Sequence, residues 1–153
     1  MRLWKKLGTN FPDSIRGNRI EAVREDGMLP QFLLPETTVL EAGTGPDLNL
    51  GDQQGETLIL TLGITRIIEQ ESIDVSIWGS ANGSDWGAKP LISFPQKFYC
   101  GTYQILFDLS EHADVKYLRA KWQVSRWGKG DPAPLFSIYL FVQAMERRMA
   151  AAG

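Results

Sequence analysis

Cysteine and histidine are nearly missing from this sequence of 153 residues, which contains one of each, Cys100 and His112. A single cysteine excludes an internal disulfide, and the two residues together fall short of the ligand set of a typical zinc site. We expect Cys100 to be a small buried apolar residue, because free cysteine is usually buried. His112 has no metal ligand or acid–base partner near it in sequence, so we expect an exposed loop residue. The sequence therefore predicts neither a metal site nor a cofactor.

Recognisable catalytic motifs are also missing. The sequence has no G-x-S-x-G nucleophile elbow, no H-E-x-x-H metal motif and no G-x-x-x-x-G-K-[ST] phosphate loop. Its two glycine-rich stretches, 41–56 and 126–136, do not open a helix and are typical of loops or of a bulged hairpin. Any pair of acids for glycoside hydrolysis would be an arbitrary choice among 18 Asp and Glu residues. We assign no catalytic residue and expect that the protein is not an enzyme.

A strong charge imbalance and long apolar runs are absent as well. With 16 Lys and Arg against 18 Asp and Glu, the formal net charge is -2, so no general field would draw the chain to nucleic acid or to an anionic membrane. No stretch has the apolar length of a signal peptide or of a transmembrane helix. These patterns argue against nucleic-acid and membrane partners and favour a soluble chain that is not exported.

The strongest positive signal is an alternation of apolar and polar residues with a period of two, which is typical of strands with one buried face. It runs through residues 57–66, 74–80, 103–110, 117–127 and 135–144. The residues expected to face the core are Leu58, Leu60, Leu62, Ile64, Val75, Ile77, Tyr103, Ile105, Phe107, Leu109, Leu118, Ala120, Trp122, Val124, Phe136, Ile138, Leu140 and Val142. Weaker candidates are one strand at 36–42 and one or two strands in 90–99, which Pro90 and Pro95 would place at a sheet edge or at strand ends. Short strands separated by turn signals predict an all-β protein, an antiparallel β-sandwich of the jelly-roll kind.

The ends of the chain do not share this alternation, and we expect an arm without strands at 1–35, a sandwich domain at 36–144 and a C-terminal tail at 145–153. The first 24 positions carry six basic against two acidic side chains, interspersed with apolar residues. We expect the arm and exposed aromatic side chains of the later strands to contact a neighbouring subunit, with a solvated, disordered tail as the alternative for the termini. The expected contact residues are Trp4, Phe11, Arg16, Arg19, Trp127 and Tyr139.

The stretch "SIWGSANGSDWG" at 76–87 predicts a hairpin with a tight turn at Asn82-Gly83, after which Trp86 begins the return strand. Trp78 should face away from the core, and the two tryptophans should pack on each other. An alternative function for the same residues is sugar binding, because an aromatic ring can stack on a pyranose while amides and carboxylates bond its hydroxyls. The residues of this alternative are Trp78, Asn82, Asp85 and Trp86.

One resemblance follows from the order of four pieces, "LNLGDQQGETLILTLGIT", "IDVSIWGSANGSDWG", "GTYQILFDLSEHADVKYLRAKWQVSRWG" and "FSIYLFV". This order resembles small β-sandwich modules of phage and phage-derived particle proteins, and more loosely discoidin-type carbohydrate-binding sandwiches. The matching positions are Gly79-Ser80, Asn82-Gly83, Trp86, Asp108-Leu109-Ser110 and Tyr117-Leu118-Arg119. The resemblance covers residues 36 to 144 and implies sandwich topology more strongly than any partner. The sugar-site loops of the discoidin-type modules are not matched, so no ligand-binding residue is carried over.

These observations together predict a structural or assembly protein. We expect a homo-oligomer or a subunit of a larger particle, located in a virion or in the cytoplasm. The alternative is a carbohydrate-binding module centred on the hairpin at 76–87.

Overall fold

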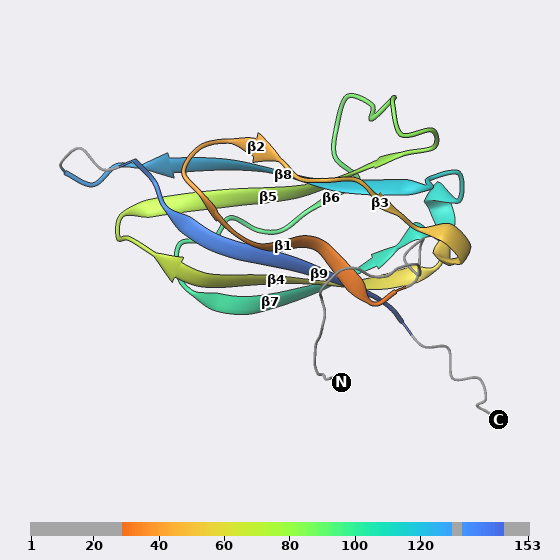
Figure 1. Cartoon of the computed structure of the whole chain (residues 1–153), viewed down its shortest axis with the longest axis horizontal. Helices are drawn as coiled ribbons and strands as arrows, with labels where there is room; N and C mark the ends of the chain where they lie inside the picture. The colour runs from red at the N-terminus through yellow and green to blue at the C-terminus, as the bar shows by residue number, and fades with distance from the viewer. Residues whose placement is uncertain (1–28, 130–132, 146–153) are drawn as a thin grey trace, which may run out of the picture.

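The computed structural model describes residues 29–129 and 133–145, which form an antiparallel β-sandwich (Figure 1). The strands of this part are β1 (Gln31–Val39), β2 (Gly43–Thr44), β3 (Leu48–Asn49), β4 (Thr57–Ile67), β5 (Glu71–Ser80), β6 (Ile92–Ser93), β7 (Gly101–Asp108), β8 (Tyr117–Arg126) and β9 (Phe136–Ala144). Two short 3-10 turns, η2 (Gly51–Gln53) and η3 (Leu109–His112), join strands. No helix in this part of the chain is long and apolar enough to cross a membrane.

The strands form two sheets that pack face to face. The first sheet has the order β1-β9-β4-β7, and the second has the order β2-β8-β5-β6 with β3 also paired to β8. Because β2 and β3 lie along the same edge of β8, they act as one interrupted strand, and each sheet then has four strands. The chain crosses between the sheets at almost every connection, which is the arrangement of a jelly roll. The predicted all-β sandwich is confirmed.

The core lies between the sheets and is built from the alternating residues that the sequence predicts. The inward rows of β4, β5, β8 and β9 are buried apart from the half-buried Val124, and Leu58, Leu60 and Leu62 are fully inaccessible to solvent. On β7 the inward residues Tyr103 and Ile105 are only partly buried, although they pack against the same core. β7 is the edge strand of the first sheet, so its inward side chains have a neighbouring strand on one side only.

The sandwich begins earlier than the expected boundary at residue 35. β1 starts at Gln31, its residues Leu33 and Leu34 are buried, and Leu29 packs against the core. The pairing of β1 with β9 shifts register twice, between Phe32 and Leu34 and again before Thr37. These irregularities break the period of two, which explains why the alternation did not reveal the strand. The remainder of the expected arm, residues 1–28, and of the tail, 146–153, lies outside the described residues.

A buried carboxylate joins two turns at one end of the sandwich. Glu71, the first residue of β5, is 1% exposed. One of its carboxylate oxygens accepts a hydrogen bond from the backbone N–H of Ile68 at 2.9 Å, and the other accepts from the N–H of Leu135 at 2.8 Å. Glu71 thus satisfies two backbone donors, one in the β4–β5 turn and one at the start of β9.

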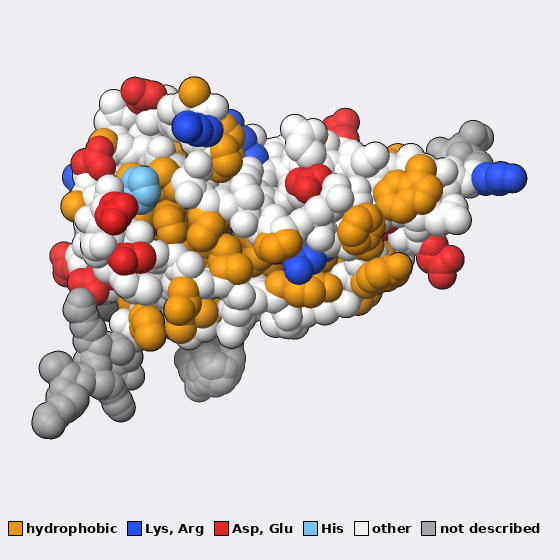
Figure 2. All heavy atoms as spheres, turned by 180° about the vertical axis from the view of Figure 1, so that it is seen from behind, with side chains coloured by type: hydrophobic (Ala, Val, Ile, Leu, Met, Phe, Trp, Pro, Cys, Tyr) orange, Lys and Arg blue, Asp and Glu red, His pale blue; other side chains and the backbone are white. Residues whose placement is uncertain are grey.

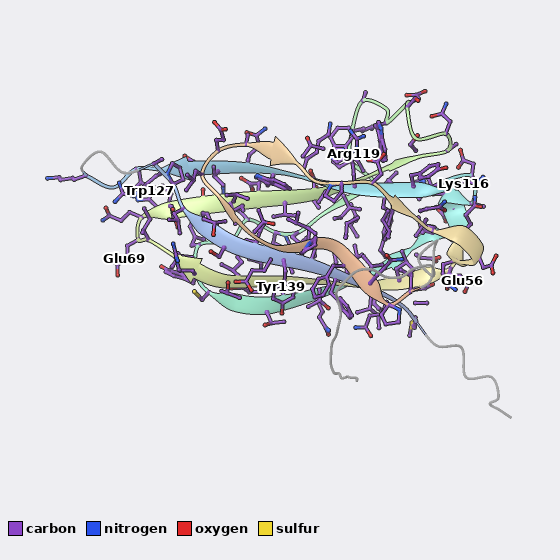
Figure 3. The ribbon with its side chains drawn as sticks, in the orientation of Figure 1. Glu56, Glu69, Lys116, Arg119, Trp127 and Tyr139 are labelled. Atoms are coloured by element: carbon purple, nitrogen blue, oxygen red, sulfur yellow. The ribbon has the colours of Figure 1, made fainter. Side chains whose placement is uncertain are left out.

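We expect Glu71→Ala to lower the free energy of unfolding by roughly 2–4 kcal/mol, because it leaves both N–H donors without their acceptor. The matched control is Glu69→Ala, which removes an exposed carboxylate from the same turn (Figure 3) and should change stability by less than about 0.5 kcal/mol. Urea denaturation followed by tryptophan fluorescence measures both. Equal effects of the two substitutions would show that the Glu71 contacts do not stabilise the fold.

Candidate functional site

Cys100 and His112, the single cysteine and the single histidine, do not lie together in a catalytic or metal-binding site. Cys100 is exposed in the connection that precedes β7, so the expectation that it is buried is wrong. His112 is partly exposed at the end of η3, which follows β7. The eight residues of β7 separate them by roughly 25 Å at about 3.3 Å per residue. Among the described residues there is also no group of three or more His, Cys, Asp or Glu side chains that could hold a metal ion.

The later strands do not present one shared aromatic face. β8 belongs to the second sheet and β9 to the first, so their outward side chains lie on opposite sides of the sandwich. Trp127 follows β8 at one end of the molecule, whereas Tyr139 lies midway along the first sheet (Figure 3). The expected contact residues Trp127 and Tyr139 therefore belong to two separate surfaces. The other four, Trp4, Phe11, Arg16 and Arg19, lie outside the described residues.

Tyr139 is part of a small aromatic group on the outer face of the first sheet. The ring of Phe32 makes edge contacts with Tyr139 and with Phe141, at centroid distances of 6.0 and 5.0 Å. Tyr139 also lies across its cross-strand partner Gly63, where any side chain would collide with the tyrosine ring. Tyr139 is therefore a packed residue that covers β4, and Phe32 is the more exposed member of this group.

Trp127 belongs to an exposed aromatic group at one end of the molecule (Figure 3). Trp127 is 59% exposed and its ring contacts Phe98 edge-on, and Phe98 in turn contacts Tyr99, which is 72% exposed. We call Phe98, Tyr99 and Trp127 the Trp127 cluster. From there, the half-buried residues Tyr103 and Ile105 continue the apolar surface along β7. Figure 2 shows hydrophobic side chains gathered in a band along the rear of the molecule.

The segment after Trp78 is a long loop rather than a tight hairpin. β5 ends at Ser80 and its return partner β6 begins only at Ile92, so Trp86 lies in the middle of the loop, and the expectation that it begins a strand is wrong. Gly83 has the left-handed φ of 82° expected of the Asn-Gly pair. The Oδ1 atom of Asn82 accepts hydrogen bonds from the backbone N–H groups of Ser84 and Asp85 and from the Ser80 hydroxyl.

Asn82 therefore holds the loop together, because these local bonds occupy its side-chain oxygen. An Asn-Gly pair occurs both in a two-residue turn and in a long loop held by its asparagine side chain. The sequence therefore could not distinguish the two, and the tight turn was predicted in place of the loop.

The two tryptophans stack on cations and not on each other. In the described part of the chain no ring contact joins Trp78 and Trp86, so the expected mutual packing is wrong. Trp78 faces outward as predicted, with the Lys121 Nζ atom 3.9 Å from its ring centroid. The guanidinium carbon of Arg119 is 3.9 Å from the centroid of Trp86, and the same side chain forms a salt bridge with Asp47 at 3.0 Å. Both cations come from β8, whose outward residues alternate with its buried row.

A pocket of about 390 Å³ lies under this loop. Its polar wall includes Ser80, Asn82, Asp85, Trp86, Lys89 and Asp114. Three of the four residues of the sugar-binding alternative are thus brought together, and Trp78 is excluded from the group. Lys89 and Asp114 also line the pocket, although no sequence motif indicates them. Asp114 arrives from the η3–β8 connection, and only the pairing of β5 with β8 brings that connection to the loop.

Neither a scan against models of known protein families nor a search of curated proteins finds a match to this chain.

The loop conformation predicts a specific response at Gly83. A β-branched side chain at a φ of 82° is strained, so Gly83→Val should lower the free energy of unfolding by about 1–3 kcal/mol. Gly83→Asn is the matched control and should cost less, because asparagine tolerates the left-handed conformation. The nearest neighbour of an added Cβ is the Tyr117 ring at 3.7 Å, so the Cβ atom itself is not crowded. Equal losses in thermal melting would show that the φ angle does not limit the substitution.

Proposed function

We propose that this protein is a non-enzymatic structural subunit that associates with copies of itself, either as a homo-oligomer or within a larger particle. The observation that carries the proposal is the apolar surface formed by the Trp127 cluster and β7. Such a contiguous, aromatic-rich surface is characteristic of protein interfaces, since Trp, Tyr and Phe are enriched at interface cores. The expected arm would add contacts. The resemblance to phage particle modules supports the same function, with a virion or the cytoplasm as its location.

The composition of this surface favours a protein partner over nucleic acid or a membrane. The Trp127 cluster and the β7 residues Gly101 to Phe107 contain no charged side chain. Nucleic-acid binding depends on Lys and Arg groups that neutralise phosphates. Here one lysine, Lys97, is stacked on the ring of Tyr103 at 4.0 Å. A surface of this composition gains most from burying apolar area against another protein.

Light scattering of the full chain over a range of concentrations tests the proposal. We expect a mass above that of the 17.1 kDa subunit, increasing with concentration. A chain lacking residues 1–28 separates the arm from the sandwich and leaves the packed Leu29 in place. We expect this truncated chain to keep its melting temperature and to retain a weaker association through the sandwich. A full-length chain that stays at 17.1 kDa at every concentration would contradict the proposal.

The pocket under the 81–91 loop favours a second candidate function, binding of a carbohydrate. Trp86 supplies an aromatic wall, and the carboxylates of Asp85 and Asp114 with the ammonium group of Lys89 supply hydrogen-bonding groups at its rim. Apolar and polar groups in this combination suit a pyranose, whose ring faces are apolar and whose edges carry hydroxyls. Asn82 also lines the pocket, with its Oδ1 atom already bonded within the loop, whereas Trp78 lies outside it.

A glycan array probed with the labelled chain tests this second candidate. We expect Trp86→Ala to weaken any binding by at least about tenfold, which corresponds to about 1.4 kcal/mol. Trp78→Ala is the matched control, since it removes a tryptophan that also stacks on a β8 cation but lies outside the pocket. Binding that is equally sensitive to both substitutions, or absent from the unmodified chain, would exclude the pocket as a sugar site.

A further inference from the structure

The four sheet edges of the sandwich differ in how well they are protected against pairing with another strand. β1 contains Pro35 and two register irregularities. The β2/β3 edge is interrupted between Thr44 and Leu48 by a segment that contains Pro46. β6 has only two residues and lies between Pro90 and Pro95. Prolines, bulges and short strands of this kind are the usual means by which edge strands avoid pairing.

β7 lacks all of these features. It is a regular strand of eight residues. Its register with β4 runs without a shift from the pair Gly101–Ile64 to the pair Asp108–Thr57. It contains no proline, lysine or arginine, and Asp108, its last residue, is its only charged group. Within the described residues no strand pairs with its outer side. The N–H and C=O groups directed to that side are therefore available to a further strand.

Apolar side chains on both faces of β7 are left partly uncovered. Leu106 is 58% exposed on the outer face of the first sheet, and Tyr103 and Ile105 are half-buried on the inner face. A strand added to the free edge would cover residues on both faces, since neighbouring strands lie about 4.8 Å apart. Water can satisfy the backbone groups of the edge, but it cannot cover these side chains.

We propose that β7 pairs antiparallel with β7 of a second copy of this chain, so that the two first sheets become one continuous sheet across a twofold axis. This inference rests on the proposed self-association and specifies its contact. A second copy fits because its own β7 is the one edge in the described part that is long, regular and free of proline. The pairing is isologous, and it therefore closes after two subunits.

The charges favour the antiparallel direction. In a parallel pair the two Asp108 carboxylates would be adjacent, and like charges directly opposite each other are destabilising. In the antiparallel pair each Asp108 instead lies toward the Gly101 end of the partner strand, away from the other Asp108. Between those ends, residues Gly101 to Phe107 are uncharged, so no other like charges meet.

Leu106→Lys tests the contact with little effect on the fold, because the side chain is already exposed. A lysine here places a charge on the pairing edge, which is one of the features by which edge strands avoid pairing. Leu40→Lys is the matched control, since Leu40 is 51% exposed and follows β1 at the opposite edge of the same sheet. Light scattering at equal concentration, with circular dichroism to confirm folding, compares both variants with the unmodified chain.

We expect the mass of the Leu106→Lys variant to fall by half and that of Leu40→Lys to stay unchanged. Amide hydrogen exchange provides a second readout, in which β7 amides of the unmodified chain become slower to exchange as concentration increases and those of Leu106→Lys do not. An unmodified chain that associates while Leu106→Lys has no effect, or while both variants dissociate equally, would overturn the β7 contact and leave the proposed function intact. An unmodified chain that remains monomeric would overturn both.

Discussion

The burial of β4 on both of its faces is the constraint on which the rest of this sandwich depends. Its inward leucines are fully buried, and each such side chain contributes about 1.5–3 kcal/mol to folding when it leaves water. Its outward residues Thr61 and Gly63 are buried too, beneath side chains of the neighbouring strands. A side chain at position 63 would meet the ring of Tyr139, which would have to move. β4 lies inside its sheet, and β7 and β1 are the edges.

This placement of β4 also explains where the candidate sites lie. The inner faces of both sheets are filled by the core, so the surfaces left for partners are the sheet edges, the outer faces and the loops at the ends. The 81–91 loop leaves the sheet where β5 ends, at Ser80. The Ser80 hydroxyl accepts hydrogen bonds from the backbone N–H groups of Asn82 and Gly83 and so begins the loop. The cations of β8 then cover the tryptophans of that region, and Arg119 is itself held by Asp47. Loop and strand residues are thus fixed together.

The sequence predicted the strands whose alternation survives folding and missed those in which pairing is irregular. β4, β5, β7, β8 and β9 were all located with the correct inward faces. The β1 residues 31–35 were missed because its register shifts disrupt the period of two. Local patterns likewise could not show that β8 and β9 lie in different sheets, so Trp127 and Tyr139 were assigned to one interface. The sheet to which a strand belongs depends on long-range pairing.

The candidate sites show the same dependence on long-range contacts. Asn82, Asp85 and Trp86 are close in sequence, and their proximity in the pocket could be predicted. Lys89 is also near in sequence, but no motif singles it out, and Asp114 reaches the pocket only through the pairing of β5 with β8. The partnership of Trp86 with Arg119 depends on the same pairing. Cys100 was expected to be buried but is exposed, because it lies in the connection between β6 and β7, where the chain crosses from one sheet to the other outside both hydrogen-bonded ladders.

The jelly-roll fold by itself does not choose between assembly and sugar binding, because the same architecture occurs in capsid proteins and in lectins. The distinction comes from how the polar groups of each surface are satisfied. In the 81–91 loop the side-chain oxygen of Asn82 is already bonded within the loop, and a ligand would have to use the remaining groups at the rim. Along β7, by contrast, the outward backbone groups have no protein partner in the described structure, and the adjoining side chains are apolar. A second strand would satisfy both kinds of group at once, and this supports the proposed self-association over the binding of a small ligand.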